Sequence, residues 1–304
     1  MKAQVVLATH APRHDLLARQ IASVREQTVS DWQCLILDDA SPDRTVVARA
    51  VAGDERFRLL PAQPHLGPYR AFERLLSQAP ADVPVFLCDQ DDRWWPQKMQ
   101  VLLDAGGTAF CAMRVVRPDG SLVRSRFLPR APDAQALSPA GLLLMNSVSG
   151  TALVISQRVR TAALPFPAPQ ARGWHDQWLA AVAARLGELQ FVDEVLVDYT
   201  QHSQQVAGDG LRRLSPTQIG SFLQRMSAAP VQDLRSRTAW VIEAARRLLE
   251  LPGPEDPALA ALAAGRFGRQ AARGVRSGRV PVARAALLLA GASLGAVRQT
   301  NSPS

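Results

Sequence analysis

The feature that most constrains the fold is the apolar run at residues 85–88, which leads directly into the carboxylates of Asp89, Asp91 and Asp92. A short, continuous apolar run is typical of a strand that a sheet buries on both faces. In an open α/β sheet, ligands bind at the carboxyl ends of the strands, which is where these acids would lie. Three crowded carboxylates repel one another unless a cation neutralises them, and oxygen ligands of this kind suit Mg²⁺ or Mn²⁺. A solvated acidic turn is the alternative interpretation.

Apolar runs of strand length alternate with helical patterns, which predicts an α/β fold with a mostly parallel central sheet flanked by helices. Strands are expected at 4–8, 32–37, 57–60, 85–88, 109–115, 148–155 and 191–197. Helices are expected at 14–27, 66–76 and 174–186, with shorter ones ending at 51 and at 145.

Polar side chains follow three of these predicted strands. Thr9 follows the first strand, Asp38 and Asp39 follow the second, and Asp89 and Asp91 follow the fourth. The carboxyl ends of parallel strands meet at one edge of a sheet, so these side chains are expected to lie together. Unrelated solvated turns would not need acids after two separate strands, so the convergence favours a ligand site.

The composition is that of an ordinary soluble protein, with 304 residues, 47% of them hydrophobic and 20% charged. The cysteines Cys34, Cys88 and Cys111 lie at scattered spacings. We interpret them as small buried hydrophobic residues in a reducing compartment, and as neither a disulfide framework nor a zinc site. No signal peptide is evident at the N-terminus, and no stretch approaches the roughly 20 apolar residues of a spanning helix.

The net charge of +8 is concentrated near the C-terminus. Residues 211–304 carry 14 arginines and 5 acidic residues, a net charge of +9, whereas the rest of the chain sums to −1. Helices are expected there at 216–229, 232–251, 257–273 and 281–297, and a stripe of arginines would share one helix face: Arg266, Arg269, Arg273 and Arg276.

This arginine stripe has two interpretations. It is either a solvated face or a contact for an anionic membrane surface or an anionic acceptor. Arginines without interleaved aromatic residues do not favour single-stranded nucleic acid, so no nucleic-acid partner is expected.

Five segments occur in a set order along the chain: Asp38-Asp39-Ala40-Ser41, Leu87-Cys88-Asp89-Gln90-Asp91-Asp92-Arg93-Trp94, Asn146-Ser147-Val148-Ser149-Gly150, His175-Asp176-Gln177-Trp178 and Tyr199-Thr200-Gln201-His202. On these segments the chain resembles glycosyltransferase family 2, and within it the rhamnosyltransferase-like members that build bacterial surface polysaccharides. The resemblance implies a GT-A fold over residues 1–208. The arginine excess and the expected helices make 209–304 a basic helical C-terminal region, which lies outside the resemblance. The chain has His10 where many relatives carry Tyr, and Ala40 where many carry Gly.

The resemblance implies a nucleotide-sugar subsite. Thr9 and Asp39 would contact the nucleoside, with Asp39 on the base or ribose and Asp38 supporting it. Asp89 and Gln90 belong to the segment that matches the family's Asp-x-Asp motif, where Asp89 would hold the sugar or ribose.

The resemblance also implies the remaining roles. Asp91 would bind Mg²⁺ or Mn²⁺ directly, and His202 would complete the metal shell. Asp176 matches the catalytic base, while Trp174 and His175 are candidates for acceptor binding. The alternatives are a helix-stabilising acid for Asp176 and a surface loop histidine for His202. Among the tryptophans, Trp178 is expected in the core.

These expectations describe an inverting, metal-dependent glycosyltransferase at the cytoplasmic face of the cell membrane. It would move a sugar from a nucleotide sugar to a saccharide or lipid-linked acceptor, and the resemblance suggests rhamnose from dTDP-rhamnose. Other donors, namely a UDP-hexose, a furanose or an N-acetylhexosamine, stay open. A non-catalytic basic protein that binds membrane or nucleic acid is the rival from another class.

Overall fold

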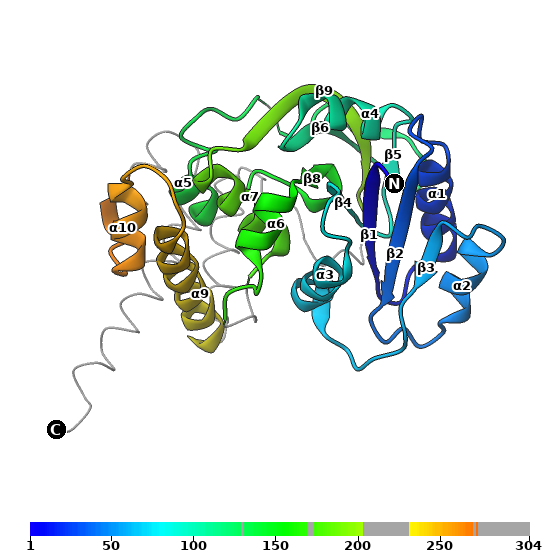
Figure 1. The fold of residues 1–304 in the computed structure, drawn as a ribbon, viewed down its shortest axis with the longest axis horizontal. Coiled ribbons are helices and arrows are strands. Elements are labelled where there is room, and N and C mark those ends of the chain that lie inside the picture. Colours follow the sequence, from blue (N-terminus) through cyan, green and yellow to red (C-terminus); the bar gives the residue numbers. More distant parts are fainter. Residues whose placement is uncertain (129, 169–172, 203–230, 270–271, 273–304) are drawn as a thin grey trace, which may run out of the picture.

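The computed structural model describes residues 1–128, 130–168, 173–202, 231–269 and 272. Its strands are β1 (Ala3–Thr9), β2 (Trp32–Asp38), β3 (Phe57–Leu59), β4 (Val85–Cys88), β5 (Arg93–Trp94), β6 (Thr108–Val116), β7 (Leu122–Arg124), β8 (Leu153–Ile155) and β9 (Leu189–Thr200). In this described part, the nine strands form one sheet in the order β3-β2-β1-β4-β8-β6-β9-β5, with β7 paired to β6 (Figure 1).

Helices cover both faces of the sheet. They are α1 (His14–Arg25), α2 (Thr45–Val51), α3 (Gly67–Gln78), α4 (Lys98–Ala105), α5 (Pro139–Leu144), α6 (Gln157–Ala163), α7 (His175–Arg185), α9 (Val231–Glu250) and α10 (Pro257–Ala263), with the 3-10 turn η1 (Gly150–Ala152). Apolar side chains of α1, α2 and α4 share one core cluster with the sheet, and those of α3, α5, α6, α7 and α9 share the other. The predicted α/β class is therefore confirmed.

The first half of the sheet is parallel, as the alternation of strands and helices predicted. β1 pairs in parallel with both β2 and β4, and β2 pairs in parallel with β3. In register, Thr9 lies opposite Asp38, and Leu7 lies opposite Cys88. The three strand ends that the sequence singled out therefore lie at one edge of the sheet.

The second half of the sheet differs from the expectation. β8 runs antiparallel between β4 and β6, and β5 and β7 are short antiparallel strands that the sequence did not predict. The strand expected at 148–155 begins only at Leu153, because residues 150–152 form the 3-10 turn η1. Helices α4 and α6 were also missed.

The C-terminal helices share the core of the rest of the protein. Trp240 of α9 is buried, and its indole N–H donates to the Tyr69 hydroxyl of α3 at 3.0 Å. A Cβ added at Gly173 would lie 2.3 Å from that indole nitrogen, so the chain before α7 runs directly against α9. Figure 1 shows α9 and α10 at the end of the molecule opposite α1 and α2. The division at residues 208/209 stays a prediction.

The helix expected at 257–273 is shorter than predicted. It ends at Ala263 because Gly265, with φ of 71°, turns the chain, and the backbone N–H groups of Gly265 and Arg266 donate back to Leu262 and Ala261. This is the hydrogen-bond pattern of a glycine-terminated helix. Arg266 therefore lies beyond the end of this helix. The prediction that Arg266 shares one helix face with the other three arginines is wrong.

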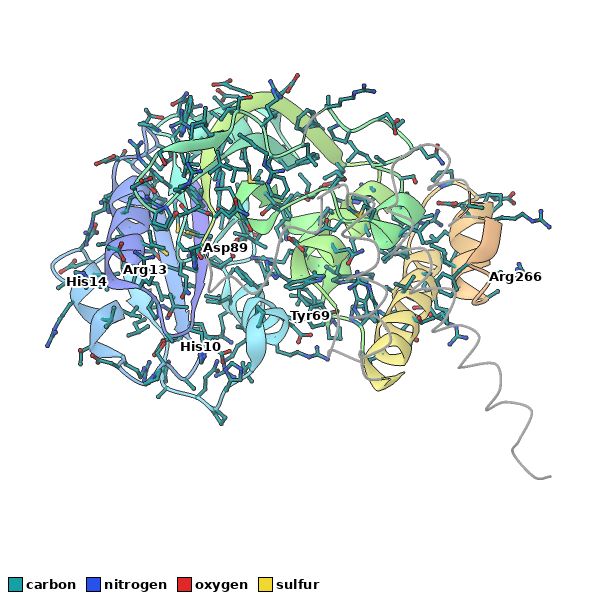
Figure 2. All side chains as sticks on the ribbon, turned by 180° about the vertical axis from the view of Figure 1, so that it is seen from behind. His10, Arg13, His14, Tyr69, Asp89 and Arg266 are labelled. Carbon is teal, nitrogen blue, oxygen red and sulfur yellow. The ribbon has the colours of Figure 1, made fainter. Side chains whose placement is uncertain are left out.

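Other expectations for this region fall on residues that the structure does not describe. Arg273, Arg276 and the helices expected at 216–229 and 281–297 lie outside the described residues. Figure 2 shows Arg266 beside α10, at the far end of the molecule from Asp89.

Two smaller expectations are confirmed. Cys34, Cys88 and Cys111 are free and buried, and Trp178 is fully buried in the core. Among the described residues, no helix combines the length and the apolar character that crossing a membrane requires.

Candidate active site

Asp38 is fixed at the end of β2 by its neighbours. Its carboxylate accepts hydrogen bonds from the hydroxyls of Thr9 and Ser41 and from the Arg44 guanidinium, at 3.0 Å for Arg44. Thr9 and Asp38 are both only 2% exposed. The side chains of Thr9 and Asp38 are thus hydrogen-bonded to each other, and they stabilise the ends of β1 and β2 from inside the protein.

Asp39 links the end of β2 to the start of α3. Its carboxylate accepts from the backbone N–H groups of Leu66 and Gly67, at 2.6 and 2.8 Å, and lies 3.0 Å from Nδ1 of His65. The backbone carbonyl of Asp39 lies 2.7 Å from Nδ1 of His10. Two exposed imidazoles, with ring centroids 4.7 Å apart, therefore flank the residue expected to contact the nucleoside.

Gln90 joins the Asp-x-Asp segment to the loop after β1. Its amide exchanges two hydrogen bonds with the backbone of His10, accepting at 2.9 Å and donating at 3.2 Å. Gln90 thereby joins the loop after β1 to the three acids that follow β4, called here the acidic row: Asp89, Asp91 and Asp92.

The acidic row follows β4, as predicted. The Asp91 carboxylate lies 2.6 Å from Nε2 of His202, which comes from the segment after β9. Burial, followed by the charges of Asp91 and Asp176, raises the pKa of Asp89 well above its ordinary value. Neighbouring negative charges disfavour the ionised form of a buried carboxyl.

Asp176 is held by the two other segments that carried the resemblance. The Asn146 side-chain amide donates to it at 2.9 Å, and the backbone N–H groups of Gly150 and Gln177 donate at 3.2 and 2.7 Å. Burial nevertheless raises the pKa of Asp176 to about 6, against the lowering effect of these hydrogen bonds. A carboxylate with a pKa near neutrality suits a general base.

The acids of the two segments share one electrostatic environment. The charge of Asp176 raises the pKa of Asp89, although 87 positions separate them in the numbering. Burial raises the pKa of the Tyr199 phenol, and the charges of all four acids raise it further: Asp92, Asp89, Asp91 and Asp176. Asp176 and the acids after β4 therefore act electrostatically on the same two groups, Asp89 and Tyr199.

The two acceptor-binding candidates, Trp174 and His175, differ in how deeply they are buried. The His175 ring is buried and stacks on Phe72, with centroids 3.8 Å apart, and burial lowers its pKa to about 3. A Cβ at Gly150 would lie 2.7 Å from His175 Nε2, so this ring packs against the backbone that holds Asp176. The packing indicates that His175 supports Asp176 from inside the protein, whereas Trp174 is half-buried at the start of α7.

Sequence reasoning missed two cationic residues around the acidic row. Lys98 of α4 is fully buried, donates to the Thr151 carbonyl at 2.6 Å and lies 3.1 Å from the Trp94 ring centroid. Burial lowers its pKa to about 7. Arg19 of α1 donates to the Asp91 carbonyl at 3.2 Å and to the Thr200 hydroxyl at 2.5 Å. Arg19 thus joins the acidic row to the end of β9, two residues before His202.

Asp92 is the third acid of the row and the one furthest inside. It is fully buried and accepts from the Thr200 backbone N–H at 2.8 Å. Burial, with the charges of Asp91 and Asp89, raises its pKa well above the ordinary value. Asp92 therefore anchors the row to β9 and is not a candidate for contact with substrate.

The donor set fits a divalent cation that also binds substrate. Among the described residues, no three or more His, Cys, Asp or Glu side chains form a ready metal cage. Asp91 and His202 converge from separate segments and supply one carboxylate and one imidazole. Mg²⁺ is usually held by one or two carboxylates together with substrate phosphates, so two protein donors are sufficient.

Two curated bacterial proteins are similar to this chain. Over 173 residues it is 25% identical to the putative teichuronic acid biosynthesis glycosyltransferase TuaG of Bacillus subtilis, covering 55% of this chain and 66% of that protein. Over 103 residues it is 36% identical to the succinoglycan biosynthesis protein ExoW of Rhizobium meliloti, covering 32% of each. The chain thus spans less than two thirds of the length of either relative.

Solved structures share the fold. TarS 1–349 of S. aureus, solved in complex with UDP-GlcNAc, superposes with a TM-score of 0.56 at 12% identity, over 100% of this chain and 93% of that one. The mannosyltransferase PcManGT of Pyrobaculum calidifontis, solved with GDP-Man and Mn²⁺, gives 0.51 at 15% identity, over 96% and 86%. These likenesses establish the GT-A fold.

The model of the family described as glycosyl transferase family 2 matches residues 5–140. This range contains the first four strands, both acidic strand ends and the Asp-x-Asp segment. Residues 5–140 of the chain therefore match glycosyl transferase family 2, in agreement with the two bacterial relatives and the shared fold.

Proposed function

We propose that this protein is a glycosyltransferase that moves a sugar from a nucleotide sugar to a saccharide or lipid-linked acceptor in surface polysaccharide synthesis. The observation that carries the proposal is the contact of Asp91 with His202 in the same acidic site as Asp176. The names of the two relatives, and the nucleotide sugars bound by the structural neighbours, point in the same direction.

On the donor side, the residues at the carboxyl ends of β1, β2 and β4 bind the nucleotide sugar. Asp39 lies between His10 and His65 and contacts the nucleoside, while Thr9 and Asp38 set its position. Asp89 holds the sugar or ribose, and Gln90 fixes the Asp-x-Asp segment to the backbone of His10. Asp91 and His202 hold Mg²⁺ or Mn²⁺, which when bound neutralises the leaving diphosphate.

On the acceptor side, Asp176 acts as the general base. Its carboxylate takes the proton of the acceptor hydroxyl while that oxygen bonds to the anomeric carbon and the carbon–diphosphate bond breaks. This single displacement inverts the anomeric configuration. Three hydrogen bonds to Asp176 fix its orientation, and burial keeps its pKa high enough for it to accept a proton. Trp174 remains the acceptor-binding candidate.

The donor sugar is the more specific part of this proposal. Rhamnose from dTDP-rhamnose is the donor that the sequence resemblance implies, and UDP-hexoses, furanoses and N-acetylhexosamines are its competitors. We place the enzyme at the cytoplasmic face of the membrane, with the arginine-rich C-terminal region toward anionic lipid. A non-catalytic basic binding protein would not need the aligned acids and the hydrogen-bonded Asp176.

A thermal-shift panel of nucleotide sugars, with Mn²⁺ or Mg²⁺ and with chelator, tests this proposal. Stabilisation by one nucleotide sugar that requires the metal is the expected result, because bound ligand stabilises the folded state. The Asp91→Ala variant should lose this stabilisation, while the exposed Asp104→Asn variant should keep it. No metal-dependent stabilisation by any nucleotide sugar would contradict the proposal.

A further inference from the structure

The 3-10 turn η1 lies between the proposed base and the segment that follows the acidic row. On one side, the backbone N–H of Gly150 donates to the Asp176 carboxylate at 3.2 Å. On the other side, Thr151 is bonded twice: its carbonyl accepts from the Lys98 ammonium at 2.6 Å, and its hydroxyl accepts from the Trp94 indole N–H at 3.3 Å. The turn therefore links Lys98 and Trp94 to Asp176.

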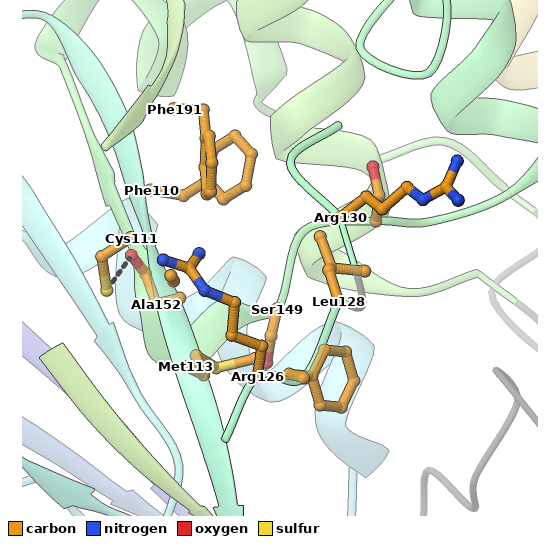
Figure 3. A pocket seen from close by; sticks show the side chains of 12 residues that line it. Phe110, Cys111, Met113, Arg126, Leu128, Arg130, Ser149, Ala152 and Phe191 are labelled. Carbon is orange, nitrogen blue, oxygen red and sulfur yellow. Dashed lines mark hydrogen bonds between the residues drawn. The ribbon is translucent and has the colours of Figure 1, made fainter. Parts of the chain in front are cut away.

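The carbonyl groups at the end of η1 are held by side chains of two other elements. The Lys98 ammonium of α4 holds the carbonyl of Thr151. The Cys111 thiol of β6 donates to the next carbonyl, that of Ala152, at 3.7 Å (Figure 3). Carbonyl groups in the last turn of a helix lack partners inside it, so these contacts set the direction of the turn. Loss of the ammonium would remove a hydrogen bond from a carbonyl of a fully buried residue, which is costly.

Lys98 occupies a position that ordinarily disfavours a lysine. Its side chain is fully buried, and it is the first residue of α4, where the helix dipole opposes a positive charge. The ammonium lies 3.1 Å from the centroid of the Trp94 ring, and the attraction of a cation to an aromatic face offsets part of this penalty. A residue that departs from local preferences in this way is typical of a functional site.

The segment that carries Trp94 and Lys98 is continuous with the acidic row. It begins directly after Asp92, the innermost of the three acids. Burial raises the pKa of Asp92, and the Thr151 hydroxyl is one of the groups that act in the opposite direction. Thr151 therefore faces the acidic row as well as the two residues that follow it, so its turn fixes Asp176 relative to the row.

We propose that Lys98 and Trp94 are positioning residues for Asp176. Both side chains are at most 1% exposed, so they act through the turn and not on substrate. They hold Thr151, which fixes the turn and directs the Gly150 N–H to the carboxylate of the base. The consequence for turnover rests on the proposed function of Asp176, whereas the consequence for its hydrogen bond does not.

The ionisation of Asp176 tests this inference without turnover. The Gly150 N–H favours the ionised carboxylate, so its displacement should raise the pKa of Asp176 above the value of about 6 that burial already produces. Lys98→Met keeps a long, unbranched side chain without the ammonium, and Trp94→Phe keeps a ring without the indole N–H. Titration of ¹³C-labelled aspartate carboxyls by NMR, assigned with Asp176→Asn, should show a pKa higher by at least about 0.5 in both variants.

Three comparisons separate this effect from loss of charge or of stability. Trp94→Phe changes no charge, so a raised pKa in it reports the hydrogen bond. His175, which packs on the same turn, stays neutral over this range because burial lowers its pKa to about 3. Arg160→Met is the matched control, because Arg160 is also a buried cation that holds backbone carbonyls, here those before β4. It should leave the pKa of Asp176 unchanged. An unchanged pKa in Lys98→Met would overturn the inference, and Trp94→Phe decides if Lys98→Met does not fold.

Turnover tests the consequence for the reaction. Lys98→Met should lower kcat at least about tenfold, while donor affinity with Mn²⁺ stays within about threefold. In the Gly150→Ala background, the same substitution should lower kcat by less than about threefold, because both changes act through one hydrogen bond. A double variant in which the two losses multiply in full would contradict this route.

The same measurements keep the two proposals apart. Near-normal turnover in Asp176→Asn would count against the proposed function, and a raised pKa of Asp176 in Lys98→Met would still support the link through the turn. Normal kcat in Lys98→Met, beside an inactive Asp176→Asn, would overturn this inference and leave the proposed function standing.

Discussion

Oδ2 of Asp91 and Nε2 of His202 lie 2.6 Å apart, although 111 positions separate these residues in the chain. Asp91 follows β4 and His202 follows β9, so the contact depends on the whole sheet between them. Arg19 supports it, because it bonds both the Asp91 carbonyl and Thr200. We propose that this carboxylate and this imidazole would together hold a divalent cation, with substrate phosphates supplying further oxygens.

Replacement of His202 by Ala should weaken metal use without unfolding the protein. Removal of one ligand is expected to raise the Mn²⁺ concentration needed for half-maximal donor stabilisation by about 10- to 100-fold. Titration of the donor-dependent melting shift with Mn²⁺ measures this. His14→Ala, at an exposed position on α1, is the control. An unchanged Mn²⁺ requirement in His202→Ala would remove His202 from the metal shell.

Replacement of Gly150 by Ala should impair Asp176 indirectly. The new Cβ would lie 2.7 Å from His175 Nε2, and His175 is already stacked on Phe72, so the backbone must shift. That shift moves the Gly150 N–H away from Asp176. We expect a loss of about 1–3 kcal/mol in unfolding free energy, by urea denaturation, and at least a tenfold lower kcat.

Gly268→Ala is the matched control for this prediction, because nothing lies within 4 Å of the Cβ it would add. Both glycines would gain one methyl group, so the comparison isolates the contact with His175. Normal kcat in Gly150→Ala would show that this backbone N–H does not position the base.

The pH dependence of turnover should report the ionisation of Asp176. Its pKa is raised to about 6, chiefly by burial, and only the ionised form accepts a proton. With saturating substrates, the rate should rise about tenfold per pH unit below pH 6 and level off above it. A rate that stays flat from pH 5 to pH 8 would contradict the assignment of Asp176 as the base.

The same shift gives a stability prediction of definite sign. The pKa of Asp176 in the folded state lies above its ordinary value of 3.8, so the folded state binds this proton more tightly. The contribution of Asp176 to folding is therefore most favourable below about pH 4 and is lost as the pH rises through about 6.

Replacement of Ala40 by Gly should stabilise the protein. Ala40 has a φ of 57°, a left-handed conformation that strains a residue with a Cβ. We expect a gain of about 1 kcal/mol in unfolding free energy, measured by urea denaturation. Ala18→Gly in the interior of α1 should instead lose about 1 kcal/mol. If both variants are destabilised alike, the strain at Ala40 is not significant.

The sequence predicted the parts of the site that depend on strand ends. Thr9, Asp38 and Asp89 follow apolar runs whose parallel pairing can be inferred from the alternation of strands and helices. Their common edge is therefore a consequence of topology, and the register of β1 with β2 and β4 bears it out. The convergence of Asp91 with His202 rested on the family resemblance alone, since β9 joins the sheet through β6.

The sequence did not reveal the parts that depend on side-chain packing across the fold. Lys98 lies two residues after Pro96 and would ordinarily face solvent, but α4 turns it inward onto the Thr151 carbonyl and the Trp94 ring. His175 stands beside the proposed base, yet its ring packs on Phe72. Both outcomes depend on partners distant in sequence, and no local pattern of apolar and polar residues specifies such partners.

We propose that Asp176 acts on the acceptor in the same site where Asp91 and His202 hold the metal that binds the donor diphosphate. Asp176→Asn keeps the side-chain size but removes the base, so we expect kcat to fall by about 100-fold or more. The affinity for the nucleotide sugar with Mn²⁺ should stay within about twofold, because Asp176 does not hold the donor. Asp104→Asn should match the wild type in both measurements.

Measurement of kcat and donor affinity in Asp176→Asn therefore tests directly whether Asp176 is the base. Nearly abolished turnover with intact metal-dependent donor binding is the expected result. Near-normal turnover in Asp176→Asn would contradict this assignment.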